Sequence, residues 1–306
     1  MEFLYFLEGI RMPILNEFML LVTRLGEETA FLVMALIVFW CVDKRRGYLL
    51  MSVGFLGTMA NQFMKLWFRI PRPWVLDPNF TILEQAREAA TGYSFPSGHT
   101  TSAVGTFGSI AATTRKKGTI ALCVILAVLV GLSRMYIGVH TPADVIVGAL
   151  TSLSLIFLLR EVPWNSRGMD ILVLVMMACS LGLMAFVSLY PFPADVDAHN
   201  LESGMKNAWT MVGCMAGVAV VYQVERKYVN FTTMAVWWAQ ILKVILGLAL
   251  VLAVKEGLRA PLEALFGNPY PARAVRYFLI VVAAGALWPA TFRHFYRLGR
   301  HVEVKK

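Results

Sequence analysis

Long apolar runs alternate with short polar connections along most of the chain. A helix that crosses a bilayer needs about 20 mainly apolar residues, because lipid offers no partner for a free backbone N–H or C=O group. The pattern therefore predicts an all-α protein, a polytopic transmembrane helical bundle. We place about nine spans near residues 28–42, 47–68, 98–114, 118–137, 142–159, 169–189, 207–224, 233–254 and 273–292.

The first 27 residues differ from these spans, because charged residues at positions 8, 11, 17 and 24 interrupt their apolar pattern. We interpret residues 1–27 as an interfacial or re-entrant amphipathic segment rather than a tenth span. They lack a basic n-region and a small-residue cleavage site, so we expect no cleaved signal peptide. Residues 28–160 then form a core with five spans, and residues 161–306 add four spans and a basic tail.

The composition supports a membrane protein. Hydrophobic residues make up 58% of the 306 positions and charged residues 15%, against 45–50% and about 25% in ordinary soluble domains. This hydrophobicity excludes a disordered chain. The four cysteines lie inside apolar runs without CxxC spacing, which is typical of small core residues and not of a disulfide framework. They are Cys41, Cys123, Cys179 and Cys214.

The net charge of +9 is best explained by membrane topology, because basic residues collect in cytoplasmic loops. If the loop at 43–46 is cytoplasmic, the connections alternate consistently and 15 of the 28 Lys and Arg residues lie on that side, including those of the C-terminal tail. The longer polar connections, 69–97, 190–206 and 255–272, are then extracytoplasmic, and long loops of this kind are commonly functional. We expect a multi-pass protein with a cytoplasmic C-terminus, the bilayer as its partner, and no nucleic acid.

A first polar cluster ends the second predicted span, at residues 65–73 (KLWFRIPRP). If the helix continues, Lys65 and Arg72 share one face because they are seven residues apart, and Pro71 and Pro73 end the helix there. Taken alone, these residues fit an interfacial basic collar for lipid head groups as well as they fit an anion site.

A second cluster opens the third predicted span, at residues 93–101 (YSFPSGHTT). Gly98 permits close backbone approach at a helix start, where free N–H groups and the positive end of the dipole bind anions. His99 lies in this first turn and can exchange a proton near neutral pH. The alternative is a helix cap with a structural histidine; it explains Ser97 but not the position of His99 beside a glycine at a membrane face.

A third cluster joins the fourth and fifth predicted spans, at residues 133–144 (SRMYIGVHTPAD). Thr141 is the expected N-cap and Pro142 the first helical residue. Asp144 then lies one turn from His140 and can pair with it. A carboxylate bonded to one ring nitrogen fixes the tautomer and leaves the other nitrogen free to attack. Asp144 also suits a purely capping role, and the two roles are compatible.

All three clusters fall at extracytoplasmic helix ends in the charge-derived orientation, so we expect them to form one pocket. Charged residues at membrane depth are costly and usually functional. An excess of cations (Lys65, Arg72 and Arg134) with oriented amides is typical of a phosphate site. No set of carboxylates suits a divalent ion, so we expect neither a metal nor any other cofactor.

The three clusters together resemble the complete signature of the type 2 phosphatidic acid phosphatases, whose superfamily includes glucose-6-phosphatases and vanadium haloperoxidases. The residues concerned are Lys65-x6-Arg72-Pro73, Pro96-Ser97-Gly98-His99 and Ser133-Arg134-x5-His140-x3-Asp144. The resemblance covers about residues 60–160 and shows no departure at any signature position.

This resemblance implies a helical core and metal-independent hydrolysis of a phosphomonoester or diphosphate. It implies that His140 is the nucleophile that forms a phosphohistidine, that Asp144 orients it, and that His99 is the general acid for the leaving group. It further implies that five residues bind the phosphoryl oxygens, namely Lys65, Arg72, Ser97, Gly98 and Arg134.

We therefore predict a phosphatase that acts on a lipid phosphate or an isoprenoid or lipid diphosphate at the extracytoplasmic face. One alternative is a phosphatase for a soluble sugar phosphate, like glucose-6-phosphatase. Another is a non-catalytic lipid-binding or transport protein that retains the phosphate site, although binding alone would not need His140, His99 and Asp144.

Residues 161–306 carry no motif that we can assign. Their four spans would shape a lipid groove, form a homodimer interface or serve another activity. Lys243, near the middle of the eighth predicted span, is interpreted as a lysine along a helix–helix seam in preference to a second functional site.

Overall fold

The computed structural model describes residues 1–87, 90–162, 166–194 and 196–298, whose regular elements are all helices, with no β-strand among them. They fall into two compact units, described separately below. The helices are α1 (Glu2–Gly9), α2 (Pro13–Thr23), α3 (Glu28–Ile37), α4 (Lys44–Phe68), α5 (Pro73–Leu76), α6 (Gly98–Ala112), α7 (Lys117–Tyr136), α8 (Pro142–Arg160), α9 (Ser166–Leu189), α10 (Ala198–Val224), α11 (Trp237–Gly257), α12 (Arg259–Phe266), α13 (Pro269–Val282) and α14 (Phe292–Arg297).

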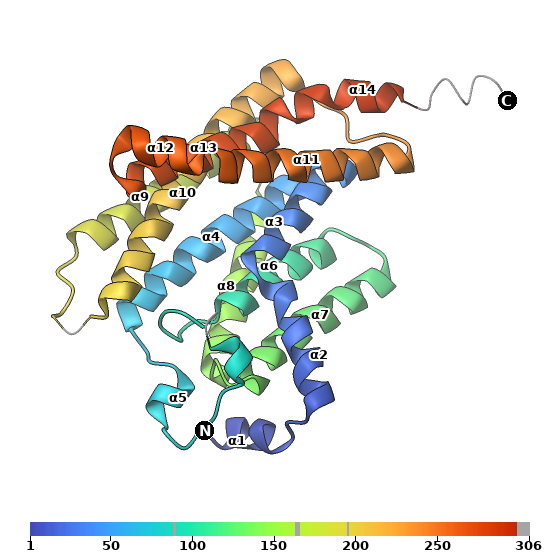
Figure 1. Cartoon of the computed structure of the whole chain (residues 1–306). Coiled ribbons are helices and arrows are strands. Elements are labelled where there is room, and N and C mark those ends of the chain that lie inside the picture. Colours follow the sequence, from blue (N-terminus) through green and yellow to red (C-terminus); the bar gives the residue numbers. More distant parts are fainter. Residues whose placement is uncertain (88–89, 163–165, 195, 299–306) are drawn as a thin grey trace. The chain divides into compact units, whose positions relative to one another are not determined.

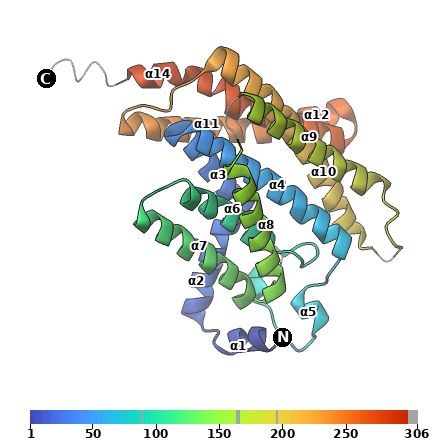
Figure 2. The same ribbon diagram turned by 180° about the vertical axis from the view of Figure 1, so that it is seen from behind.

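The first unit comprises residues 1–34, 49–162 and 189–204 and holds all three signature clusters. In it α6 lies between α7 and α8, and α2 runs along α7 (Figures 1 and 2). Hydroxyl groups join α6 to α8 without any charged side chain. The Ser152 hydroxyl donates to the Thr101 carbonyl at 2.6 Å, and the Thr101 hydroxyl lies 3.3 Å from the carbonyl of Gly148.

The N-terminal segment is helical, as expected for an amphipathic piece, but it is not continuous. α2 and α3 are bent by 55° at a break around Gly26 and Glu27, so the first apolar stretch is a broken span or a re-entrant loop. The segment is tied to the rest of the unit by polar contacts. The Tyr5 hydroxyl donates to Asp77 at 2.8 Å, and the Arg11 side chain donates to the Tyr136 carbonyl at 3.0 Å.

The second unit comprises residues 35–48, 163–188 and 205–306. Residues 163–165 and 299–306 of this unit lie outside the described part of the chain. In it α11 lies alongside α13 and α14, which follow each other along one helical stretch, Pro269–Arg297 (Figure 1). Lys243 on α11 is fully buried: its Nζ atom donates to the Thr233 carbonyl at 3.1 Å and lies 4.3 Å from the ring centroid of Phe292. These contacts show a lysine packed inside its own unit.

Six of the described helices are long and apolar enough to cross a membrane, or seven if the bent pair α2–α3 counts as one span. The prediction of nine spans is therefore not confirmed. All nine predicted segments are helical over most of their length, but α4 carries too many polar and charged residues and α6 is only 15 residues long. The predicted span at 233–254 begins instead at Trp237, and residues 299–306 of the basic tail lie outside the described residues.

Candidate active site

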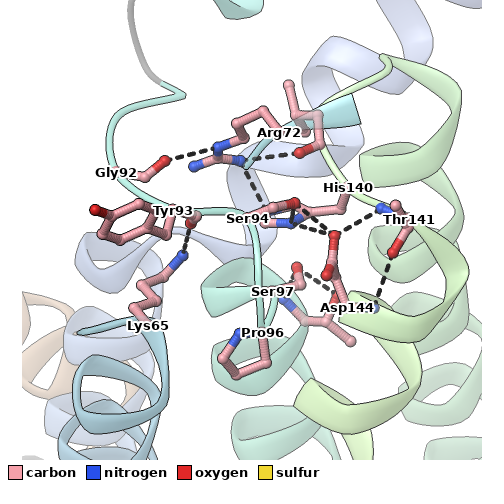
Figure 3. Close-up of polar contacts among 12 residues, drawn as sticks. Lys65, Arg72, Gly92, Tyr93, Ser94, Pro96, Ser97, His140, Thr141 and Asp144 are labelled. Atoms are coloured by element: carbon pink, nitrogen blue, oxygen red, sulfur yellow. Dashed lines mark hydrogen bonds and ion pairs between the residues drawn. The ribbon is translucent and has the colours of Figure 1, made fainter. Parts of the chain in front are cut away.

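The three signature clusters meet at the C-terminal end of α4 and the starts of α6 and α8 (Figure 3). A cavity of about 230 Å³ opens there, and six of the eight predicted site residues line it: Lys65, Arg72, Gly98, His99, Arg134 and His140. The other two, Ser97 and Asp144, are buried behind this wall, with 0% and 1% of their surfaces exposed.

Local sequence explains how α6 and α8 begin at the cavity. Ser97 is the N-cap of α6, where its Oγ atom accepts from the hydroxyl of Thr100 at 2.9 Å. Thr141 and Asp144 form a capping box at the start of α8, and Pro142 occupies the first helical position. These predicted caps are confirmed. The cap at Ser97 places the first turn of α6 at the cavity, which Gly98 and His99 line.

Arg72 reaches the site in a different way from the one predicted. α4 ends at Phe68, and Arg69 adopts a left-handed conformation with φ of 51°, so Lys65 and Arg72 are not on one continuous helix. Arg72 instead extends from the following loop. Its guanidinium donates to the carbonyls of Thr91, Gly92 and Val139 at 2.7, 3.0 and 3.0 Å.

His140 is almost fully buried, with its two ring nitrogens facing opposite charges. The Nη1 atom of Arg72 lies 3.2 Å from Nε2 of His140, and Asp144 Oδ2 lies 3.4 Å from Nδ1. A guanidinium can only donate, so Nε2 accepts and carries a lone pair. The proton of the neutral ring is then assigned to Nδ1, on the side of Asp144. This is the tautomer that a nitrogen nucleophile requires.

The electrostatic surroundings keep the ring neutral. Burial, followed by the positive charge of Arg72, lowers the pKa of His140 well below its usual 6.5. Burial also lowers the pKa of Arg72, to about 10, so Arg72 remains a cation near neutral pH. A neutral imidazole beside a fixed cation suits attack on an anionic phosphorus centre.

Asp144 is held by more than its histidine. Its Oδ2 atom accepts from the backbone N–H of Thr141 at 2.7 Å and from the hydroxyl of Ser94 at 2.5 Å. Capping and orientation are therefore performed by the same carboxylate oxygen. The distance to His140 is long for a hydrogen bond, as is common before substrate tightens a site.

The amide of Ser97 is already used, since it donates to the backbone carbonyl of Asp144 at 3.0 Å. Gly98 and His99 follow it in the first turn of α6, where amides lack intrahelical partners. The amides of this helix start that could bind an anion are therefore those of Gly98 and His99, whereas Ser97 caps the helix and bonds to Asp144.

Arg134 and Lys65 supply positive charge from α7 and α4. The Nη1 atom of Arg134 donates to the hydroxyl of Thr23 at 2.7 Å, whereas its buried Nε atom has no hydrogen-bond partner among the described residues. Lys65 donates through Nζ to the Tyr93 carbonyl. An orphaned N–H in a cavity with three cations fits an anionic ligand.

Sequence reasoning missed three residues that the structure brings to the site. Ser94 bonds to Asp144, Asn61 donates to the Pro96 carbonyl at 3.2 Å, and Glu27 lines the cavity. Ser94 lies within the second cluster and Asn61 four positions before Lys65, but nothing in their spacing indicates a partner. Within the described residues, no group of three or more His, Cys, Asp or Glu side chains is arranged to hold a metal ion.

This helical fold, with its buried histidine among cations and helix starts, defines the class of membrane phosphatases. Comparison with known families identifies the class more closely. Residues 45–167 match the PAP2 superfamily model, and residues 209–300 match the model of the PAP2 superfamily phosphatase transmembrane extension. The chain belongs to the PAP2 superfamily and is a phosphatase.

Curated relatives support this assignment. The chain is 32% identical over 164 residues to phosphatidylglycerophosphatase B of Bacillus subtilis, which covers 49% of the chain and 76% of that protein. It is 31% identical over 130 residues to undecaprenyl-diphosphatase BcrC of Bacillus subtilis, covering 42% of the chain and 64% of that protein. It is also 31% identical over 146 residues to the undecaprenyl-diphosphatase of Sulfolobus acidocaldarius, covering 47% and 68%. No solved structure matches the chain significantly.

Proposed function

We propose that the protein hydrolyses a lipid phosphate or an isoprenoid or lipid diphosphate at the extracytoplasmic face of its membrane, through a phosphohistidine and without a metal. The observation that carries this proposal is the neutral, buried His140 between Arg72 and Asp144, at the end of helices apolar enough to cross a bilayer. The names of the relatives, phosphatidylglycerophosphatase and undecaprenyl-diphosphatase, agree with a lipid substrate.

In the first half-reaction Nε2 of His140 attacks phosphorus and forms the N–P bond while the P–O bond to the lipid alcohol breaks. Arg72 moves its Nη1 donor from Nε2 to a phosphoryl oxygen, and the positive charge that remains on the ring is stabilised by Asp144. Lys65, Arg134 and the amides of Gly98 and His99 neutralise the other oxygens.

His99 gives its proton to the departing lipid alkoxide. The negative charge of a bound phosphate stabilises the protonated form of His99 in this role. In the second half-reaction water attacks phosphorus, His99 accepts a proton from that water, and the N–P bond to His140 breaks. Inorganic phosphate leaves, His140 is neutral again, and His99 carries the proton that the next leaving group takes up.

The proposed side of the membrane for the active site rests on the distribution of Lys and Arg residues and not on the fold. We propose that α4 and α6 cross the bilayer with the other helices, because they carry the catalytic residues and their polar side chains face the cavity instead of lipid. The first turn of α4 and the connection between α6 and α7 are rich in Lys and Arg, which favours the cytoplasm for them and the extracytoplasmic side for the site.

The mechanism is tested with purified protein in detergent containing EDTA, given a panel of isoprenoid diphosphate, phosphatidate, sphingosine phosphate and a sugar phosphate. We expect phosphate release from the lipids, and an acid-labile phosphoenzyme on rapid quenching with a labelled lipid phosphate. An absolute need for added divalent metal contradicts the mechanism. Turnover of the sugar phosphate alone favours the glucose-6-phosphatase-like alternative, and no turnover favours a binding or transport protein.

Sidedness is tested with single cysteines in a cysteine-free variant. His199→Cys lies in an exposed stretch predicted to be extracytoplasmic, and Lys116→Cys lies in an exposed stretch predicted to be cytoplasmic. In intact cells an impermeant maleimide should label the first and spare the second. The reverse pattern would overturn the orientation and leave the catalytic mechanism intact.

A further inference from the structure

The catalytic cavity has further polar lining residues whose chemistry the phosphoryl-transfer steps do not use. The same cavity is lined by two acidic residues, Glu27 and Glu28, and by polar residues of α4, including Thr58 and Gln62. These polar groups do not suit a hydrocarbon chain, because they would lose their hydration on contact with it without gaining a hydrogen bond.

The break between α2 and α3 places Glu27 at the cavity. Glu27 is extended, with φ of −69° and ψ of 148°, and its carbonyl accepts from the N–H of Phe31 as α3 begins. Directly before it, Gly26 packs so closely that a Cβ atom would lie 2.7 Å from the carbonyl oxygen of His99. The position of Glu27 beside the cluster around His99 is thus set by backbone contact.

The Glu27 carboxylate also lies close enough to Arg134 for electrostatic interaction. Arg134 is 4% exposed and keeps an unpartnered Nε donor in the same cavity. The cavity therefore presents an anion site and an acceptor site next to each other. A ligand that matches both carries a phosphate and, within a few bonds of it, a hydrogen-bond donor.

We propose that Glu27 and Gln62, which line the same cavity, form a head-group subsite that binds a hydroxyl or ammonium group adjacent to the phosphate. The enzyme then prefers lipid phosphate monoesters with such a donor over polyprenyl diphosphates. A second phosphate in the leaving group would face the two carboxylates and be repelled, whereas a hydroxyl or ammonium donates to them. This inference rests on the proposed lipid phosphatase function and names the substrate class of that same site.

The test compares kcat/KM of the wild type and Glu27→Gln in identical mixed micelles. Phosphatidylglycerophosphate supplies a hydroxyl, sphingosine 1-phosphate an ammonium, phosphatidic acid neither, and farnesyl diphosphate a second phosphate. We expect Glu27→Gln to lower the preference for each donor-bearing substrate over phosphatidic acid by about 10-fold or more. The preference for diphosphate over phosphatidic acid should rise. If the preference falls for only one of the first two substrates, that substrate shows whether the hydroxyl or the ammonium group is the ligand of Glu27.

The matched control is Glu17→Gln, which removes the same charge from an exposed position in the same segment, away from the cavity. It should leave all preferences unchanged. If Glu27→Gln lowers kcat/KM for every substrate by the same factor, or changes kcat/KM for none of them, the subsite is refuted while the proposed function stands. If the wild type releases phosphate from no lipid, both proposals fall.

Discussion

The hydroxyl of Ser94 donates a 2.5 Å hydrogen bond to Oδ2 of Asp144 and lies 3.4 Å from Nδ1 of His140. Ser94 is fully buried, and its own N–H donates to the Ile70 carbonyl at 2.8 Å, which fixes the side chain in place. Ser94 therefore fixes the position of the Asp144 carboxylate, which in turn orients His140, the proposed nucleophile. Its effect on the reaction passes through Asp144 and His140, which makes it a positioning residue.

Ser94→Ala should lower kcat by about 10-fold, because a charge-assisted hydrogen bond that orients Asp144 is lost. KM and vanadate affinity should stay unchanged, since the cations and amides remain. The measurement is steady-state kinetics with a lipid phosphate. Ser109→Ala is the control, because that buried hydroxyl on α6 has no partner among the described residues. A rise in KM without loss of kcat would argue against positioning.

His140→Ala should abolish turnover, by at least about 10⁴-fold as for other nucleophiles of catalytic triads. Vanadate should still raise the melting temperature of the variant, since Lys65, Arg72 and Arg134 remain. His199→Ala, at an exposed position, should behave like the wild type. Unchanged turnover in His140→Ala would refute the assignment of the nucleophile.

The depressed pKa of His140 predicts how stability depends on pH. In the folded protein the ring stays neutral below pH 6.5, whereas in the unfolded chain it takes up a proton there, so acidification favours unfolding. The free energy of unfolding should fall by at most about 1.4 kcal/mol for each pH unit below 6.5 on account of this group. Melting temperatures measured from pH 8 to 5 should fall more steeply for the wild type than for His140→Asn. Parallel curves would show that the ring is protonated in the folded state.

Gly26→Val should destabilise the first unit and lower activity together. A Cβ atom there would lie 2.7 Å from both the His99 carbonyl and a methyl group of Val130, so the break would have to move away from the site. Overpacking of this kind costs about 1–3 kcal/mol. Gly9→Val is the control, because no atom lies within 4 Å of a Cβ atom at that position. Equal melting temperatures and activities for the two variants would contradict the close packing of the break.

Lys243→Met should retain lipid phosphatase activity and fold at least as stably as the wild type. Lys243 has no acidic partner among the described residues, so replacing this buried cation by an apolar side chain of similar length removes a desolvation cost, while the hydrogen bond to Thr233 is a small loss. Thermal unfolding and the substrate panel measure both effects. Loss of activity in a stable variant would instead favour a second functional site in residues 161–306.

The helices, their caps and the residue types of the site can be predicted from the sequence alone. The capping box of Thr141 and Asp144 and the cap at Ser97 depend on residues three positions apart, so local spacing is enough to predict them. The three signature clusters likewise carry their chemistry within short segments, which explains why six of their residues were correctly expected around one cavity.

The groups from distant parts of the sequence that complete the site become apparent only in the folded structure. Ser94 and Asp144 are 50 positions apart, and Glu27 reaches the cavity through a break whose position no periodicity marks. Apolar length alone gives fewer spans than the nine predicted, because α4 carries polar side chains that line the cavity and α6 has only 15 residues. Local hydrogen bonds are encoded in spacing, whereas contacts across loops depend on the path of the whole chain.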